Sequence, residues 1–198
     1  MISTFETIIQ HYDRCASLVE DDARAMGWSS QFNQNLRFEV INYLVDLSGS
    51  DILDVGCGDG ALFHFLMERD NSFNYKGIDI SSKMIQRAQT RYPGISIRQS
   101  NFFDYYATHD VVICSGGLSI CSEKDPMVFL NYAIDHLLKI TNEHLIFNVL
   151  SAKSSKKDPL FNYYEPSVVL DLCFTKSSYV TMHHSYLPND FTIHIVKS

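Results

Sequence analysis

Apolar residues along this chain follow two different spacings, and each spacing predicts its own kind of element. Short runs rich in β-branched and aromatic residues are followed by segments in which apolar residues recur every three or four positions. The runs predict strands near 51–55, 74–80, 95–98, 109–115 and 143–150. The longer spacing predicts helices near 59–69, 82–91 and 126–139. Strands that alternate with helices are typical of a parallel sheet with crossover helices.

The two ends of the chain depart from this alternation. Before the first strand, helical spacing over residues 5–19 and 31–47 predicts two helices. At the other end, a predicted helix near 166–174 is followed by strand-like runs at 179–186 and 191–195, which a short turn with a proline joins. Adjacent strands with so short a connection pair antiparallel. We therefore expect an α/β protein whose mostly parallel sheet ends in an antiparallel hairpin.

Length and composition indicate the setting of this fold. The chain has 198 residues, of which 45% are hydrophobic, and this suffices for the core of one compact domain. We expect a single domain over 1–198, with a helical cap at 1–48 and the sheet-bearing core at 49–198. No apolar run reaches the roughly 18 residues of a membrane span, and no leader pattern opens the chain, so we expect a soluble, cytoplasmic protein without a membrane partner.

Cysteine usage and charge argue against several classes of site. The five cysteines, an odd number, are scattered through mostly apolar runs, unlike a disulfide framework or a metal knuckle, so we expect free core thiols and no metal. Sixteen basic against twenty-three acidic residues give a net charge of -7. This balance makes a broad nucleic-acid surface an unfavourable interpretation.

The most informative segment is ILDVGCGDG at residues 52–60, an apolar strand that runs into a turn with alternating glycines and then into a helix. Glycines let the backbone turn tightly and approach a ligand, which is how such loops hold a nucleotide cofactor. Gly56, Gly58 and Ala61 also satisfy the dinucleotide pattern G-x-G-x-x-A. Spacing alone therefore does not decide the cofactor.

Charge favours a cationic ligand in this loop. Asp54 stands at its entry and Asp59 inside it. A dinucleotide would bring an anionic pyrophosphate to the start of the helix, where an acid repels it. S-adenosylmethionine has no phosphate, and its sulfonium and ammonium groups are attracted to acids.

On these residues the loop resembles motif I of the class I S-adenosylmethionine-dependent methyltransferases. The resemblance implies a doubly wound, Rossmann-like sheet of seven strands, mostly parallel, with the last strand inserted antiparallel and helices before the first. It also implies S-adenosylmethionine as the cofactor, held by Asp54, Gly56, Cys57 and Gly58.

A second segment supports a ribose-binding acid. Asp79 ends an apolar run a little over twenty residues after the glycine loop. A carboxylate at the tip of the neighbouring strand can accept both ribose hydroxyls, in nicotinamide enzymes as well as in methyl-donor enzymes. The continuation, with Ser81 and Met84, resembles the corresponding segment of small-molecule methyltransferases, which implies that Ile80 and Met84 also border the cofactor. Ser81 or Ser82 also fits a helix cap.

Two later segments extend the resemblance. Asn101 and Phe102, after the third strand, fit the positions at which the family hydrogen-bonds the adenine amine and packs on the ring. After the fourth strand, Ser115 and Gly116 are expected to border the sulfonium and Leu118 the substrate, because ligands bind at the carboxyl ends of strands in an open α/β sheet. A plain turn at Gly116 remains the alternative.

The remaining candidates lie in the helices before the sheet and in the segments after its fifth strand. By analogy with family members whose N-terminal helices cover the cofactor, Arg37 pairs with the methionyl carboxylate and Tyr12 covers the methyl group; a surface arginine and a core tyrosine are the alternatives. Tyr163, Tyr164 and His183 are candidate substrate residues. We assign no catalytic base.

The class of substrate follows mostly from absent motifs. After the fourth strand the chain has neither an N/D/S-P-P-Y/F segment nor a Pro-Cys pair, which argues against amide, base-amine and cytosine C5 methylation. We expect methyl transfer to an oxygen or nitrogen of a small organic molecule. A tRNA or protein acceptor, signalled by a basic patch at Lys153 to Lys157, stays open, as do a non-catalytic module that binds S-adenosylmethionine and, more remotely, a nicotinamide oxidoreductase.

Overall fold

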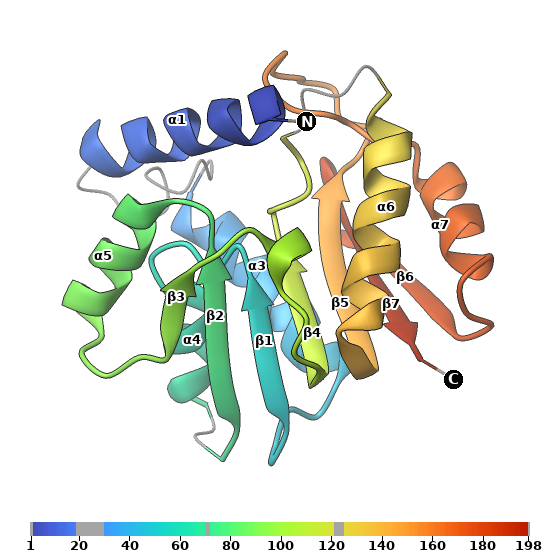
Figure 1. Ribbon diagram of the computed structural model, residues 1–198. Coiled ribbons are helices and arrows are strands. Elements are labelled where there is room, and N and C mark those ends of the chain that lie inside the picture. The colour runs from blue at the N-terminus through green and yellow to red at the C-terminus, as the bar shows by residue number, and fades with distance from the viewer. Residues whose placement is uncertain (1, 19–29, 70–71, 121–124, 198) are drawn as a thin grey trace.

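One sheet of seven strands organises the molecule, with strand order β3-β2-β1-β4-β5-β7-β6 (Figure 1). The computed structural model describes residues 2–18, 30–69, 72–120 and 125–197. The strands are β1 (Asp51–Val55), β2 (Asn74–Asp79), β3 (Ile97–Gln99), β4 (His109–Ser115), β5 (Thr141–Leu150), β6 (Val180–Leu187) and β7 (Asp190–Val196). The helices are α1 (Ile2–Leu18), α3 (Gln31–Leu44), α4 (Ala61–Met67), α5 (Ser82–Arg91), α6 (Pro126–Lys139) and α7 (Pro166–Phe174), with a 3-10 turn η1 (Phe102–Asp104).

The pairing of the strands places a switch point between β1 and β4. β1 pairs in parallel with β2 on one side and with β4 on the other. The strand order therefore runs outward in opposite directions from β1, to β2 and β3 on one side and to β4 and β5 on the other. β7 inserts antiparallel between β5 and β6. The predicted seven-stranded, doubly wound sheet with an antiparallel C-terminal hairpin is confirmed.

Alternating burial divides the core into two layers. Leu53 and Val112 pack on one face of the sheet beneath α6 and α7, whereas Ile52 and Val111 pack on the other beneath α3 and α4. Successive side chains of a strand point to opposite faces, so strands covered on both sides are apolar throughout. This explains why β1 and β4 appear in the sequence as continuous apolar runs.

Several boundaries differ from the predicted ones by a few residues, with local causes. Gly60 has φ +83°, outside helical geometry, so α4 begins at Ala61 rather than near residue 59. β3 begins at Ile97 because a turn persists up to Ile95, whose N–H donates to the Tyr92 carbonyl at 3.1 Å. α3 ends at Leu44, before the predicted residue 47, since Val45 is extended.

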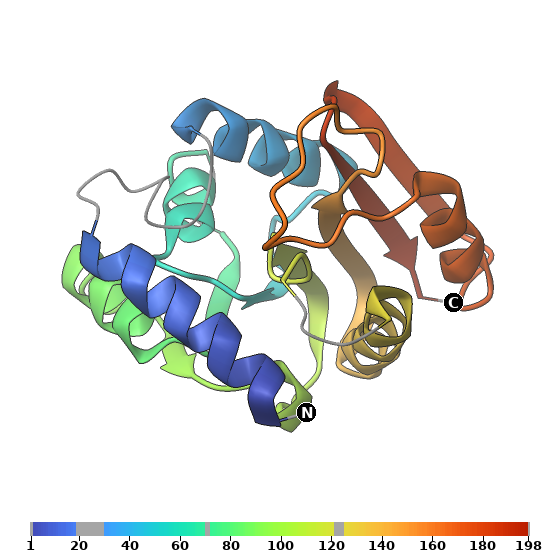
Figure 2. The same cartoon turned by 90° about the horizontal axis from the view of Figure 1, so that it is seen from above.

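Helix α1 lies across the carboxyl edge of the sheet (Figures 1 and 2). Ser81, at the start of α5, donates to Asp13 at 2.5 Å, and Lys83 donates to Ser17 at 2.9 Å. These contacts fix the helix over the strand ends where ligands bind in open α/β sheets.

The cysteines and the helices bear on two expectations from the sequence, free core thiols and the absence of a membrane span. Cys57, Cys114 and Cys173 are buried free thiols and Cys15 is half-buried, while Cys121 lies outside the described residues. In the described part of the chain, none of the helices combines the length and apolar character that crossing a membrane requires.

Candidate functional site

A cavity of about 240 Å³ lies at the carboxyl edge of the sheet and is lined in part by α1. This is far more than the roughly 10–15 Å³ that one water molecule requires. Its wall combines the ends of β1, β2 and β4, the helices α1 and α3, and the loops after β3, β5 and β6. Thirteen of the seventeen predicted cofactor and substrate residues lie in this wall: Tyr12, Arg37, Asp54, Gly56, Cys57, Asp79, Ile80, Met84, Asn101, Phe102, Ser115, Gly116 and Tyr163.

The glycine loop supplies bare backbone to the cavity. Gly56 has φ +74°, a conformation that side-chain-bearing residues rarely adopt, and it faces Gly117 across the wall. The N–H groups of Gly56 and Cys57 both donate to the Ile78 carbonyl, at 2.8 and 3.1 Å. The loop is thus tied to the end of β2, next to Asp79.

Asp79 is fixed by two backbone donors. Its Oδ2 accepts the N–H of Gly58 at 2.9 Å and its Oδ1 accepts the N–H of Ser81 at 2.8 Å. Burial raises the pKa of Asp79 to about 6, against the opposing effect of these hydrogen bonds. The site therefore holds the Asp79 carboxyl group in a defined orientation. Without a ligand, its negatively charged form is destabilised by burial.

Asp54 is a second buried acid in the wall. The hydroxyl of Tyr75 donates to its Oδ2 at 2.8 Å. Burial raises the pKa of Asp54 to about 7, only partly offset by that hydrogen bond. Two carboxyls of this kind favour a ligand with positive charge.

Asp59 does not take part in this arrangement, so the charge argument made for it from the sequence is wrong. Its side chain is fully buried, and Oδ2 lies 3.1 Å from Arg91 and 3.7 Å from Arg87, both on α5. Asp59 is absent from the residues that line the cavity. The preference for a cationic ligand therefore depends on Asp54 and Asp79.

The turn after β3 contributes an amide and an aromatic ring to the cavity wall. Asn101 Oδ1 accepts the N–H of Phe103 at 3.1 Å, which fixes the amide at the start of η1. The rings of Phe102 and Phe103 lie 4.2 Å apart, and Phe102 is only half-buried. An amide beside a partly open aromatic face suits a flat heterocycle.

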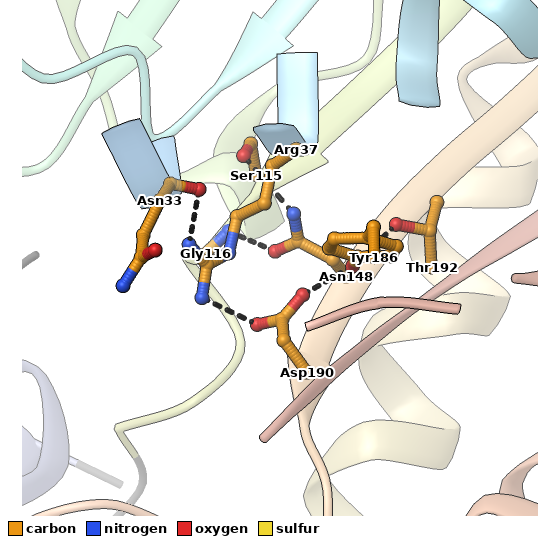
Figure 3. A network of polar contacts seen from close by, with 8 residues as sticks. All are labelled: Asn33, Arg37, Ser115, Gly116, Asn148, Tyr186, Asp190 and Thr192. Atoms are coloured by element: carbon orange, nitrogen blue, oxygen red, sulfur yellow. Dashed lines mark hydrogen bonds and ion pairs between the residues drawn. The ribbon is translucent and has the colours of Figure 1, made fainter. Parts of the chain in front are cut away.

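The end of β4 is held by a residue that the sequence analysis missed. Asn148 of β5 accepts the N–H of Gly116 at 2.8 Å and donates to Ser115 Oγ at 3.2 Å (Figure 3). Asn148 is buried within the otherwise apolar run of β5. A buried amide in such a strand is hydrogen-bonded to neighbouring polar groups. The single asparagine within this apolar run is therefore the sequence signal that could have identified Asn148.

Arg37 lies in the cavity wall with an acid partner. Its Nη2 donates to Asp190 Oδ2 at 2.9 Å and its Nη1 donates to the Asn33 carbonyl at 2.8 Å (Figure 3). The surface alternative for Arg37 is wrong, because its side chain is 3% exposed. Asp190, at the start of β7, also lines the cavity and was not singled out in the sequence.

Aromatic residues of α1 and of the loop after β5 also line the cavity. Tyr12 comes from α1, and Phe161 and Tyr163 come from the loop. The rings of His11 and Phe161 lie 6.1 Å apart in an edge-on arrangement, so the helix and the loop contact each other. The Asp158 N–H donates to the Tyr163 hydroxyl at 2.8 Å, which orders the loop.

Four predicted site residues lie outside the wall. Leu118 and Tyr164 belong to the core, where the Tyr164 hydroxyl donates to the Leu118 carbonyl at 3.2 Å, so a substrate role for them is wrong. His183 lies on β6 against the ring of Tyr43, 5.8 Å away, and does not face the cavity. Gly58 contributes through its N–H to Asp79 instead of lining the cavity.

Comparison with known proteins gives a consistent result. Residues 52–139 match the family of the methyltransferase domain. A Mycobacterium tuberculosis protein named as a methyltransferase, Rv1506c, is 29% identical over 158 residues, which cover 74% of this chain and 93% of that protein. A second M. tuberculosis protein, the uncharacterized methyltransferase Rv0089, is 35% identical over 68 residues, or 34% of each chain.

Solved structures share the fold at low sequence identity. The magnesium protoporphyrin IX methyltransferase of Synechocystis PCC 6803, with bound S-adenosylhomocysteine, has a TM-score of 0.68 at 18% identity and covers 97% of this chain and 95% of its own. The N-methyltransferase NodS of Bradyrhizobium japonicum WM9, also with S-adenosylhomocysteine, has a TM-score of 0.69 at 16% identity, with 96% and 97% covered.

Proposed function

Because this chain is a class I S-adenosylmethionine-dependent methyltransferase, we propose that it transfers the methyl group to an oxygen or nitrogen of a small organic molecule. The observation that carries this proposal is the aromatic group of Tyr12, Phe161 and Tyr163 in the wall of the cavity. Such a pocket suits a compact acceptor that contributes apolar or aromatic surface.

The residues of the wall fit S-adenosylmethionine. Asp54 and Asp79 are buried acids with raised pKa values, which a cationic ligand would stabilise in their charged form. Gly56 presents backbone where a side chain would be strained. We assign the ribose hydroxyls to Asp79, the adenine to Asn101 and Phe102, and the methionyl carboxylate to Arg37.

Bound S-adenosylmethionine supplies an electrophilic methyl group on a sulfonium. The chain's own contribution is positioning and exclusion of water, which account for much of the rate in displacements of this kind. Asn148 holds Ser115 and Gly116 at the end of β4, where we assign them to border the sulfonium. We assign Tyr12 of α1 to cover the methyl group, and burial raises the pKa of its hydroxyl, so Tyr12 stays neutral.

A macromolecular acceptor receives less support from the loop after β5. Lys153 is paired with Glu165 at 2.7 Å, and Lys157 lies over the ring of Tyr163 at 5.7 Å. Lys153 and Lys157 are therefore engaged by residues of their own region, which reduces the support for a basic patch that binds a macromolecule. The named relatives in which an acceptor is stated include a magnesium protoporphyrin IX methyltransferase, which supports a small-molecule acceptor by analogy.

The test of this proposal is transfer of a labelled methyl group. The protein is incubated with methyl-tritiated S-adenosylmethionine and, separately, a library of small phenols, amines and carboxylic acids, bulk tRNA, and a protein extract. We expect label in a small molecule, identified by a 14 Da mass increase, and none in tRNA or protein. Label in either macromolecule alone would overturn the proposed acceptor class, and the Asp79→Ala variant serves as the inactive control.

A further inference from the structure

A buried ion pair joins helix α3 to the C-terminal hairpin at the wall of the cavity. The side chains of Arg37 and Asp190 are 3% and 2% exposed and lie 2.9 Å apart. Arg37 Nη1 also donates to the Asn33 carbonyl, one turn earlier in α3. The guanidinium is therefore held through both of its terminal nitrogens (Figure 3).

The carboxylate of Asp190 is itself fixed from behind. The Tyr186 hydroxyl donates to Asp190 Oδ1, and the same hydroxyl lies 2.8 Å from Thr192 Oγ1. The backbone of Asp190 pairs with Leu150 of β5 and with Leu187 of β6. Asp190 thus belongs to the rigid sheet, and the position of the guanidinium is set by the sheet as well as by α3.

The charged side chains of the cavity wall explain why the orientation of Arg37 matters for binding. Among the described residues that line the cavity, Arg37 is the one with a basic side chain, whereas Asp54, Asp79, Asp158 and Asp190 are acidic. A ligand carboxylate therefore has one favourable partner in the wall. A guanidinium offers five N–H donors in a rigid plane, so fixing one edge determines where the other donors point.

We propose that Asp190 is a positioning residue, which holds the Arg37 guanidinium in the orientation that receives the methionyl carboxylate of the cofactor. This inference rests on the proposed role of Arg37 and extends it to a residue at the start of β7. Tyr186 acts one step further back, because it orients Asp190.

A positioning role for Asp190 and a role in charge balance alone predict opposite effects of the same substitution on cofactor binding. If Asp190 only neutralised Arg37, its replacement by asparagine would leave more positive charge for the cofactor carboxylate and would strengthen binding. If Asp190 positions Arg37, the same replacement weakens binding, because asparagine presents one acceptor oxygen in place of the two that Tyr186 and Arg37 use.

The experiment compares two ligands by isothermal titration calorimetry. S-adenosylhomocysteine carries the amino-acid group, whereas 5′-methylthioadenosine keeps the adenosine and the sulfur and lacks the carboxylate. We expect Asp190→Asn to weaken S-adenosylhomocysteine about tenfold, the loss of one charge-assisted hydrogen bond, and to change 5′-methylthioadenosine by less than about twofold. Tyr186→Phe should follow the same pattern with a smaller effect.

Arg37→Ala and the double variant Arg37→Ala/Asp190→Asn complete the cycle. We expect the double variant to bind S-adenosylhomocysteine no more weakly than Arg37→Ala, because Asp190 acts through Arg37. Asp135→Asn is the matched control. Asp135 is a half-exposed residue of α6 that pairs with Lys176, and this variant should bind both ligands normally. Thermal unfolding of each variant establishes that it is folded.

The outcomes separate this inference from the proposed function. Unchanged or tighter binding of S-adenosylhomocysteine by Asp190→Asn, an equal loss for both ligands, or additive effects in the double variant would each overturn the positioning role while Arg37→Ala still loses affinity. If Arg37→Ala binds both ligands as the wild type does, the assignment of Arg37 itself fails. Methyl transfer to a small molecule is decided separately, by the labelling experiment.

Discussion

The carboxylate of Asp79 accepts the backbone N–H of Gly58 with one oxygen and that of Ser81 with the other, at 2.9 and 2.8 Å. One side chain at the tip of β2 therefore ties together the glycine loop and the start of α5. Since both lone-pair-rich oxygens are directed by backbone donors, the carboxylate keeps its orientation before a ligand arrives, which lowers the ordering cost of binding.

We expect Asp79→Ala to reduce the affinity for S-adenosylhomocysteine about a hundredfold, because it removes the proposed ribose acceptor and the anchor of the loop together. Asp79→Asn should lose less, since its single amide oxygen can still accept one of the two N–H groups. Calorimetric titration of both variants checks this order. Asp171→Ala, an exposed change on α7, is the control, and equal affinities for all three variants would contradict the assignment.

The second prediction concerns stability and pH in the ligand-free protein. The native pKa of Asp54 is raised to about 7 by burial, whereas an unfolded aspartate titrates near pH 4. Between these values the native state holds a proton that the unfolded state releases, so the free energy of unfolding falls as pH rises from about 4 to 7 and then levels off. The effect is on the order of a few kcal/mol.

Asp54→Asn removes this titration while keeping an acceptor for the Tyr75 hydroxyl. We therefore expect the variant to be more stable than the wild type at pH 8 and similar to it at pH 5. Denaturant unfolding at the two pH values measures the difference. If the variant is less stable than the wild type at pH 8, burial of the charged Asp54 carboxylate does not destabilise the native state and the prediction is wrong.

The same two acids predict a pH-dependent preference between cofactor and product. S-adenosylmethionine carries a sulfonium that S-adenosylhomocysteine lacks, and Asp54 and Asp79 gain their negative charges between about pH 6 and pH 7. The ratio of the two affinities should therefore shift about tenfold toward S-adenosylmethionine between pH 5.5 and pH 8. Calorimetry at both pH values tests this, and Asp54→Asn should flatten the dependence. A ratio that is independent of pH in the wild type would exclude the mechanism.

The fold could be predicted from the sequence because local signals were strong and agreed with one another. The apolar runs of β1 and β4 are buried on both faces, and Ser81 caps α5 through the N–H of Met84. Errors at element ends came from backbone geometry that has no periodic signal. Gly60, whose positive φ delays α4, is an example.

The site could be predicted only where one short segment carries the chemistry. Asp79 and Gly56 lie in such segments, whereas the pair of Arg37 and Asp190 spans 153 positions and depends on the register of the hairpin. Asp59 misled for the same reason, because its partner Arg91 lies on the next helix. Sequence alone does not reveal which of two adjacent residues faces a cavity, as Tyr163 and Tyr164 illustrate.

The fourth prediction concerns a close approach of β2 to the glycine loop. A Cβ at Gly77 would lie 2.7 Å from Ile97 Cγ2 and 2.9 Å from both Cβ and Sγ of Cys57. Gly77→Ala should therefore destabilise the protein by about 1–3 kcal/mol through overpacking and weaken S-adenosylhomocysteine by displacing Cys57.

Gly94→Ala is the matched control for this change. Gly94 has φ +90° and nothing within 4 Å of an added Cβ, so only backbone strain results. We expect Gly94→Ala to lose about 1 kcal/mol of stability with normal ligand affinity. Denaturant unfolding and calorimetry of both variants separate the two effects, and normal affinity in Gly77→Ala would refute the link to the loop.

The last prediction concerns the attachment of α1 over the cavity. Ser81 Oγ accepts the N–H of Met84 at 3.2 Å, which caps α5, and donates to Asp13 of α1. Asp13→Ala breaks only the second contact, whereas Ser81→Ala breaks both. Because Ile8 and Tyr12 of α1 line the cavity, loosening the helix opens a route for the ligand to leave. We expect both variants to release S-adenosylhomocysteine several-fold faster in stopped-flow measurements.

Stability distinguishes the two variants. Ser81→Ala should lose about 1 kcal/mol through the missing cap, whereas Asp13→Ala should stay within about 0.5 kcal/mol of the wild type, as is usual for contacts near the surface. Faster release in Ser81→Ala alone would place the effect in α5 and the neighbouring Asp79, not in α1. Faster release in both, at unequal stability, follows only if the contact between Asp13 and Ser81 keeps the helix over the ligand.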